Sequence, residues 1–88
     1  MKITVRYFAK VREALGAGED IDLSTLGEAA PTTVGALRDW LVARSEAHAR
    51  ALGPDQGLRT ACDQVMCGPD EPLSPGAEVA FFPPVTGG

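Results

Sequence analysis

Hydrophobic and polar residues alternate at the start of the chain, and this pattern predicts a β-strand. Over residues 2–8, apolar side chains at every second position give one buried face and one solvated face. A shorter alternation around Ile21 and Leu23, flanked by aspartates, predicts a second strand. Residues 27–31 are predicted to form a loop, because they are bounded by Gly and Pro. The first third of the chain is therefore expected to hold two strands.

Three segments have the spacing of helices. Residues 9–15 carry apolar side chains three and four positions apart and end before Gly16, a common helix stop. The main helix is predicted to begin at Thr33, whose hydroxyl can cap the first turn, and to run to about residue 44 or 45. A short Ala-rich helix over residues 46–52 ends before a Gly-Pro pair. The stripe of the main helix consists of Val34, Leu37 and Leu41, with Trp40 at its edge.

The second half of the chain predicts three further strands. Residues 58–67 are interpreted as two short strands joined at Asp63-Gln64, a poorer hairpin turn than Asn-Gly or Asp-Gly. The Pro-Gly order within residues 74–77 is typical of a type II turn. A final alternating strand is expected over residues 78–82. It must end at Pro83, which has no amide hydrogen to donate.

The order of these elements indicates an α+β fold. Two strands, a main helix and further strands predict a mixed sheet packed on that helix, with the first and last strands side by side at the centre. This arrangement is the β-grasp, or ubiquitin-like, fold. The sequence contains no internal repeat or linker, so residues 1–82 are expected to form one domain. Residues 83–88, called here the C-terminal segment, are expected to form an extended tail.

Composition and charge narrow the function classes. An 88-residue chain is short for an enclosed active-site cavity, since small domains bury a thin core. The net charge of −4 and the scattered Lys and Arg residues argue against nucleic acid as a partner. No signal peptide or membrane-spanning run is visible, so no membrane partner is predicted and a cytoplasmic location is expected.

The reactive side chains do not form a recognisable catalytic or metal-binding motif. Cys62 and Cys67 lack the Cys-x-x-Cys spacing of a zinc site, and His48 alone cannot complete one. The two cysteines are interpreted as small buried residues on a strand pair, with a hairpin disulfide as the alternative. His48 is expected at the surface. No metal site is therefore predicted, and no base is positioned to activate a cysteine.

The sequence ends in Gly87-Gly88, and this diglycine is its main chemical feature. It places a carboxylate at the end of a chain without side chains, which can enter a narrow active site of another protein. A frayed terminus is the alternative. Pro83 and Pro84 argue against it, because they stiffen the approach and hold it away from the domain.

Three stretches together resemble a known family, the small subunit of molybdopterin synthase, or MoaD-type sulfur carriers. The stretches are residues 5–13 (VRYFAKVRE), 33–38 (TVGALR) and 70–88, whose FFPPVTGG ending is the most specific part. The similarity covers nearly the whole chain. Such carriers usually have Asn-Gln where this chain has Asp63-Gln64, and its cysteines are also not typical.

The resemblance implies a carrier that is not catalytic alone and binds no cofactor. A ubiquitin-activating-like adenylyltransferase would attach the Gly88 carboxylate to AMP, consuming ATP and Mg²⁺. A sulfurtransferase would then supply sulfur, leaving a thiocarboxylate on Gly88. The large synthase subunit would use that sulfur to convert cyclic pyranopterin monophosphate into molybdopterin, in a heterotetramer.

The resemblance also implies which residues contact the partner. Gly87 would remove steric bulk, Val85 and Thr86 would make backbone contacts, and one phenylalanine would face the core while the other anchors the interface. The predicted partner-binding residues are Phe81, Phe82, Pro84, Val85, Thr86 and Gly87.

Three other functions remain open at this point. The first is sulfur carriage for another pathway, such as thiazole formation in thiamine synthesis. The second is a ubiquitin-like protein modifier that forms isopeptide bonds with lysines. The third is an interaction module with an inert C-terminus, whereas a free-standing enzyme fits the sequence least.

Overall fold

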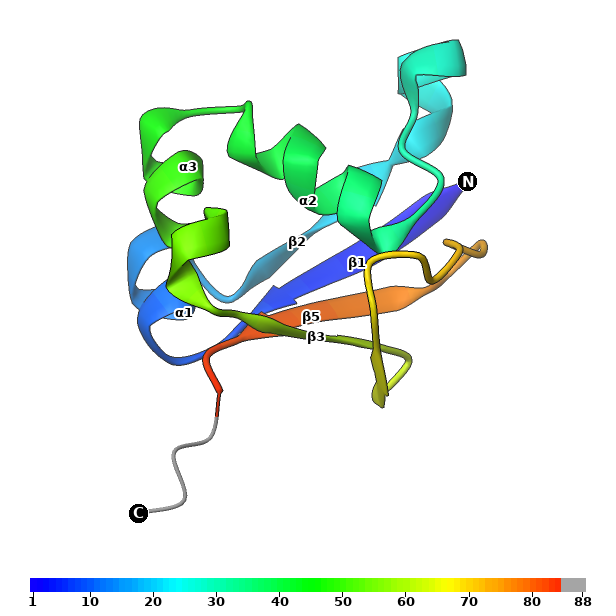
Figure 1. Cartoon of the computed structure of the whole chain (residues 1–88). Helices are drawn as coiled ribbons and strands as arrows, with labels where there is room; N and C mark the ends of the chain where they lie inside the picture. The colour runs from blue at the N-terminus through cyan, green and yellow to red at the C-terminus, as the bar shows by residue number, and fades with distance from the viewer. Residues whose placement is uncertain (85–88) are drawn as a thin grey trace.

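Five strands form one mixed β-sheet in the computed structural model, which describes residues 1–84 of the chain (Figure 1). Their order across the sheet is β2-β1-β5-β3-β4. The central strands β1 and β5 run parallel, and the other neighbouring pairs are antiparallel. The strands are β1 (Lys2–Tyr7), β2 (Gly18–Asp22), β3 (Arg59–Cys62), β4 (Val65–Cys67) and β5 (Glu78–Phe82). The predicted β-grasp fold is thereby confirmed, including the central pairing of the first and last strands.

The helices lie on one side of this sheet (Figure 1). Helix α2 (Val34–Val42) crosses the sheet, whereas α1 (Ala9–Leu15) and α3 (Glu46–Leu52) lie near the end where β5 finishes. Two short 3₁₀ helices, η1 (Leu23–Ala29) and η2 (Pro54–Gln56), connect these elements. Within the described residues no helix is long and apolar enough to cross a membrane.

Side-chain caps explain where helices α2 and α3 begin. The Thr33 hydroxyl accepts a hydrogen bond of 3.1 Å from the amide of Ala36, as the sequence predicts. The Ser45 hydroxyl does the same for the amide of His48, also at 3.1 Å. The main helix ends at Val42, so the predicted end at residue 44 or 45 was wrong. The reason is that Ser45 is extended in order to cap α3, which requires α2 to end first.

The region after β2 also differs from the prediction. Leu23 and residues 27–29 belong to η1, whereas a strand and a loop were expected. The cause is local, because the Asp22 carboxylate accepts hydrogen bonds from the amide of Ser24 at 3.0 Å and from its hydroxyl at 2.6 Å. These bonds turn the chain into a helical path directly after the strand.

Both predicted turns are present. Asp63 and Gln64 have positive φ angles of 51° and 68°, as a two-residue hairpin turn of the primed type requires. The Asp63 carboxylate accepts a 3.0 Å bond from the amide of Glu78, and its own amide donates to the Glu78 carbonyl. These two hydrogen bonds hold the turn against β5, which explains how Asp63-Gln64 can form the hairpin turn although Asn-Gly or Asp-Gly would favour it more. Gly76, with φ of 78°, occupies the turn before β5.

The hydrophobic core lies between the helices and the inner face of the sheet. Alternation along the central strands places Val5, Tyr7, Val79 and Phe81 on that face. The Tyr7 and Phe81 rings stack with centroids 6.4 Å apart. The helices and adjoining segments complete the core with Val11, Leu23, Val34, Leu37, Leu41, Leu52 and Leu73. The inner face is thus used for folding, which leaves the outer face for other contacts.

Candidate partner-binding site at the C-terminal edge of the sheet

Strand β5 carries the chain to one edge of the domain, where the C-terminal segment begins (Figure 1). The strand ends at Phe82, and Pro83 and Pro84 follow without regular secondary structure. Each proline has a restricted φ and also disfavours the helical conformation of the residue before it. The chain therefore leaves the sheet in an extended form, with Pro83 half-buried and Pro84 exposed.

The two aromatic residues at the end of β5 point to opposite faces of the sheet. Phe81 faces inward and has 0% exposure, so its ring is inaccessible to a partner. Phe82 is half-buried on the outer face, where the helices do not cover it. The expectation that one phenylalanine faces the core is confirmed for Phe81. Of the two rings predicted to bind a partner, only that of Phe82 is available.

A row of side chains crosses the outer face of the sheet next to Phe82. Pairing of neighbouring strands aligns Arg6 with Ala80, Ala80 with Ala61, and Ala61 with Met66. Because residues paired across a sheet share one face, this row lies on the outer side. Met66 is 55% exposed. The row continues the apolar surface of Phe82 toward the hairpin.

A shallow hollow of about 840 Å³ lies on this outer face and reaches the C-terminal segment. We call it the outer hollow; its lining consists of Arg6, Phe8, Ala9, Gln64, Glu78, Ala80, Phe82, Pro83 and Pro84. Phe8, which is 42% exposed, is the largest exposed apolar side chain in it. An apolar surface next to Pro83 and Pro84, where the C-terminal segment begins, is suited to binding another protein.

Sequence analysis missed Phe8 and Met66 as candidate binding residues. Phe8 could have been recognised from the sequence. It is an aromatic residue at a position where the alternation of residues 2–8 otherwise places polar side chains. Met66 had no comparable signal, since its side of the sheet depends on the strand register.

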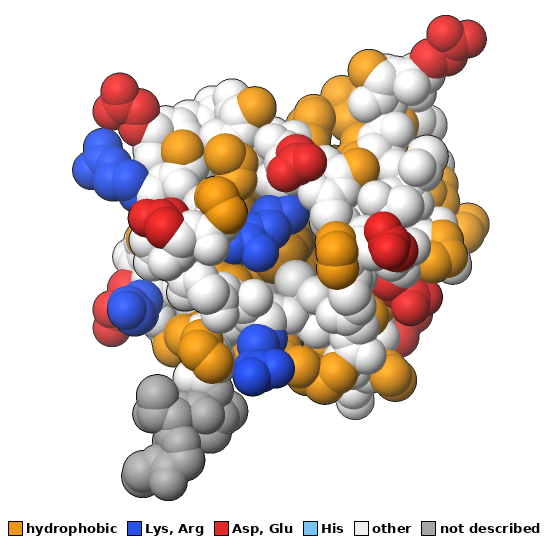
Figure 2. Space-filling view, viewed as in Figure 1, with side chains coloured by type: hydrophobic (Ala, Val, Ile, Leu, Met, Phe, Trp, Pro, Cys, Tyr) orange, Lys and Arg blue, Asp and Glu red, His pale blue; other side chains and the backbone are white. Residues whose placement is uncertain are grey.

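The outer face of the sheet carries an ion pair between Arg6 and Glu78. The Nε of Arg6 lies 3.2 Å from a carboxylate oxygen of Glu78 across the central strands. Both side chains are partly exposed, so this pair contributes little to stability. Figure 2 shows Lys and Arg side chains lying apart from one another on the face in view. The outer hollow therefore presents an apolar surface that includes the Arg6–Glu78 ion pair in its lining.

The two cysteines are free thiols, so the alternative of a hairpin disulfide is contradicted. Both were predicted to be small buried residues on a strand pair, and both lie on β3 and β4, half-buried against the core. Burial, followed by the negative charge of Asp63, raises the pKa of the Cys62 thiol. Since the thiolate is the reactive form, Cys62 is a poor nucleophile.

His48 does not take part in a reactive cluster. Its Nδ1 lies 2.7 Å from the Ser45 hydroxyl, within the cap of α3, and its side chain is half-buried where a surface position was expected. Among residues 1–84, no three His, Cys, Asp or Glu side chains are placed to hold a metal ion.

The other predicted site residues lie outside the described residues. These residues are Val85, Thr86, Gly87 and Gly88. The described part of the site thus consists of the outer hollow and the beginning of the C-terminal segment. It offers a surface for a protein partner next to the segment whose last residue was predicted to react.

Comparison with known proteins identifies similar chains. The model of the ThiS family matches residues 5–88. The molybdopterin synthase sulfur carrier subunit of Escherichia coli is 45% identical over 86 residues, which cover 98% of this chain and 99% of that protein. The match to the family model includes the C-terminal diglycine.

Solved structures share the fold. Two crystal structures of the small archaeal modifier protein 1 (SAMP1) of Haloferax volcanii are 26% identical to this chain. They superpose with TM-scores of 0.73 and 0.68 and cover 100% and 96% of this chain, and 100% and 98% of their own. A complex of subunits 1 and 2 of the molybdopterin-converting factor from Helicobacter pylori contains a chain of the same fold. That chain has a TM-score of 0.68 and 24% identity, with complete coverage of both chains.

Proposed function

This chain belongs to the ThiS family, and from that premise we propose that it is a molybdopterin synthase sulfur carrier subunit whose Gly88 holds the sulfur. The carrier role is the part that the relatives support directly, because the Escherichia coli protein has that name and matches over nearly its full length. A carrier contributes a reactive terminus and binding surfaces, while its partners perform the catalysis. The match of the family model through residue 88 is the observation that carries the proposal.

The proposed chemistry begins with activation of the Gly88 carboxylate. A carboxylate is a poor acceptor for a nucleophile, so an adenylyltransferase partner would join it to the α-phosphate of ATP and release pyrophosphate, with Mg²⁺ as its cofactor. A sulfurtransferase would supply sulfur at the oxidation level of sulfide, and this sulfur would bond to the carbonyl carbon of the acyl-adenylate and displace AMP. The product would be a thiocarboxylate, which is nucleophilic at neutral pH.

The described residues support this proposal through what they position. Pro83 and Pro84 end strand β5 and disfavour a helical conformation where the chain leaves the sheet. Gly87 and Gly88 add no side chain that would block a narrow active site. The proposed roles of Val85 and Thr86 are backbone contacts within that site.

We further propose that the large subunit of the synthase binds the outer hollow. Phe82 and Phe8 supply its aromatic surface, and Pro84 continues it toward Gly88. The Helicobacter pylori structure is a complex of subunits 1 and 2 of the molybdopterin-converting factor, which is an assembly of this type. The transfer of sulfur to cyclic pyranopterin monophosphate and the heterotetrameric assembly are part of the same proposal.

A protein modifier is the second candidate, because SAMP1 has the same fold and a chain of similar length. A modifier would join Gly88 to lysine side chains through isopeptide bonds. A carrier would instead accumulate the thiocarboxylate.

The test is to incubate the chain with ATP, Mg²⁺, the adenylyltransferase and a sulfur donor, and to compare it with a variant lacking Gly88. Cleavage after Glu78 releases residues 79–88, a peptide without Met or Cys. Replacement of one oxygen by sulfur in this peptide therefore cannot be confused with side-chain oxidation. We expect this change in the full chain only. Sulfur loading that is unchanged by loss of Gly88 would contradict the proposal, and Gly88–lysine conjugates in cell extracts would favour the modifier.

A further inference from the structure

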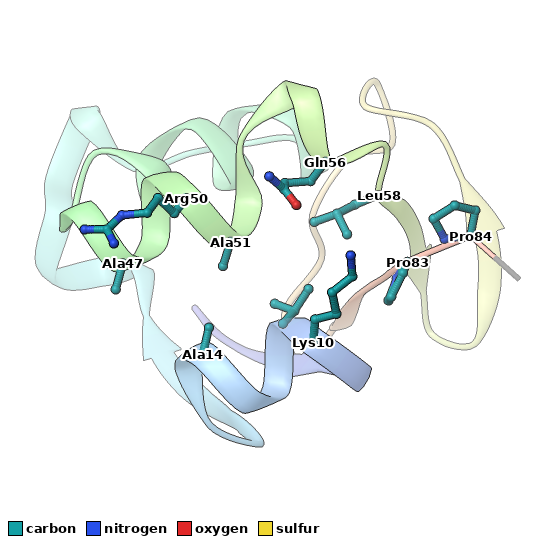
Figure 3. A pocket seen from close by; sticks show the side chains of 10 residues that line it. Lys10, Ala14, Ala47, Arg50, Ala51, Gln56, Leu58, Pro83 and Pro84 are labelled. Atoms are coloured by element: carbon teal, nitrogen blue, oxygen red, sulfur yellow. The ribbon is translucent and has the colours of Figure 1, made fainter.

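A second hollow lies on the other side of the C-terminal segment, between helices α1 and α3 (Figure 3). We call it the α1–α3 groove, and its volume is about 620 Å³. Its walls come from Val11 and Ala14 on α1 and from Ala47 and Ala51 on α3. Three of these four residues are alanines, whose side chains are too short to fill the space between two helices. The groove is therefore open to another protein.

Charge in the groove is not balanced. Lys10 extends from α1 toward Gln56, which lies on the α3 side of the groove (Figure 3). Within residues 1–84, none of the ion pairs includes Lys10. Arg50, also at the groove, is 3.3 Å from a carboxylate oxygen of Glu46. Lys10 thus provides an unpaired cation in a chain whose net charge is −4.

The groove is continuous with the proposed partner-binding site. Pro83 and Pro84 line both the α1–α3 groove and the outer hollow. A protein that encloses the C-terminal segment therefore meets both hollows, one on each side of these prolines. The surface in the groove combines small apolar side chains with Lys10, the lining cation that has no ion pair among residues 1–84, and this combination complements an apolar side chain next to a carboxylate.

We propose that the α1–α3 groove is a second docking site for the large subunit of the synthase, which places an apolar side chain and a neighbouring carboxylate there. This inference rests on the proposed function, since it concerns the same partner. The apolar side chain packs against Ala14, Ala47 and Ala51, and the carboxylate pairs with Lys10. The large subunit then occupies both hollows and contacts Pro83 and Pro84, which line each of them.

Two variants and two matched controls test the inference in the full chain. Lys10→Glu reverses the charge in the groove, and Arg12→Glu makes the same change on α1 at an exposed position outside it. Ala47→Leu fills part of the groove, and Ala49→Leu adds the same atoms to α3 at an exposed position outside it. The measurement is the Kd for the large subunit by calorimetry, with urea unfolding of each variant to verify the fold.

We expect Lys10→Glu and Ala47→Leu each to raise the Kd about tenfold over their controls. The effect of Lys10→Glu decreases when the salt concentration is raised, because screening weakens a charge pair at a rim. The inference is overturned if either groove variant binds as tightly as its control. If the unchanged chain does not bind the large subunit, the proposed function fails, and this inference fails with it.

Discussion

Phe81 and Phe82 are neighbours in the sequence, but they belong to two different regions of the molecule. The Phe81 ring is fully buried and stacks on Tyr7 in the core between sheet and helices. The Phe82 ring lies on the outer face, where no helix covers it, and lines the outer hollow together with Phe8. One peptide bond thus separates the core from the proposed binding surface.

The difference between Phe81 and Phe82 shows how one strand of a small domain can contribute both to the core and to a surface that binds other proteins. A chain of 88 residues has a thin core, and the inward-facing residues of β5, Val79 and Phe81, are needed for folding. The alternate residues of the same strand are free to contact partners. Changes on the inner side should therefore affect stability, and changes on the outer side or in the C-terminal segment should affect function.

The largest effect is expected where function depends on the C-terminal segment alone. Replacing Gly87 with Trp should reduce sulfur transfer at least about 100-fold, since a bulky side chain would clash in a narrow active site. The urea midpoint should stay unchanged. Rates of sulfur transfer and urea unfolding of the same preparation measure both. Full activity of the Gly87→Trp variant would contradict the proposal that sulfur transfer depends on the C-terminal segment, whereas stability depends on the core of the domain.

The comparison of the two aromatic residues can be tested directly with a matched pair of variants. Phe81→Ala should cost about 3–5 kcal/mol in the free energy of unfolding, because it leaves a cavity in the core. Phe82→Ala should cost about 1 kcal/mol or less, but it should weaken binding of the large subunit about tenfold or more. Urea unfolding and calorimetric binding are the two measurements. Equal losses of stability in both variants would contradict the assignment of the two faces.

Tyr7 tests the inner region through its pH dependence. Burial, together with the nearby charge of Glu19, raises the pKa of Tyr7 to about 12 from its ordinary value of 10.0. Its hydroxyl has no hydrogen-bond partner among the described residues. Because the folded state holds this proton more tightly, its contribution is fully present below pH 10 and is lost as the pH rises toward 12. The loss should be about 3 kcal/mol.

The control for this prediction is Tyr7→Phe, which lacks the titrating group. The free energy of unfolding of the two proteins should diverge between pH 10 and pH 12. The chain contains a single tyrosine, so the rise in near-ultraviolet absorbance that accompanies tyrosinate formation reports this group alone. If Tyr7 ionises near pH 10 in the folded protein, its hydroxyl is more accessible to water than the structure indicates.

The smallest effect is expected for the thiols, which belong to the inner side of the hairpin. Cys62→Ser and Cys67→Ser, separately and together, should retain sulfur loading of Gly88, because the raised pKa of Cys62 disfavours its reactive form. Each change should cost about 1 kcal/mol in stability. Sulfur-loading assays of the folded Cys62→Ser, Cys67→Ser double variant test this prediction. A loss of loading in that variant would show that the thiols take part in the chemistry.

The sequence predicted the elements with regular periodicity better than their ends. Alternation identified β1 and β5, and the Thr33 cap identified the beginning of α2. The end of α2 was wrong because it depends on Ser45, a residue that caps the next helix. The η1 helix was missed because hydrogen bonds to the Asp22 side chain compete with the strand pattern.

The candidate site shows the same limit. Phe82 could be named from the sequence as one of two adjacent aromatic residues, but its face followed only from the strand pairing. Met66 joins the outer row through the register of β3 with β4, and the alanines of the α1–α3 groove meet only when two helices are placed together. These are contacts between distant segments, which local patterns do not encode.

The residues alone were enough to predict the β-grasp order of elements, the end of the last strand at Pro83-Pro84 and the resemblance of the final residues to sulfur carriers. These features depend on periodicity, on the fixed geometry of proline and on the order of residues along the chain. Long-range contacts determine which phenylalanine is buried, which side chains form the outer hollow and that Pro83 and Pro84 line both hollows. Strand register and helix placement decide these points, because both arise from long-range packing of the core.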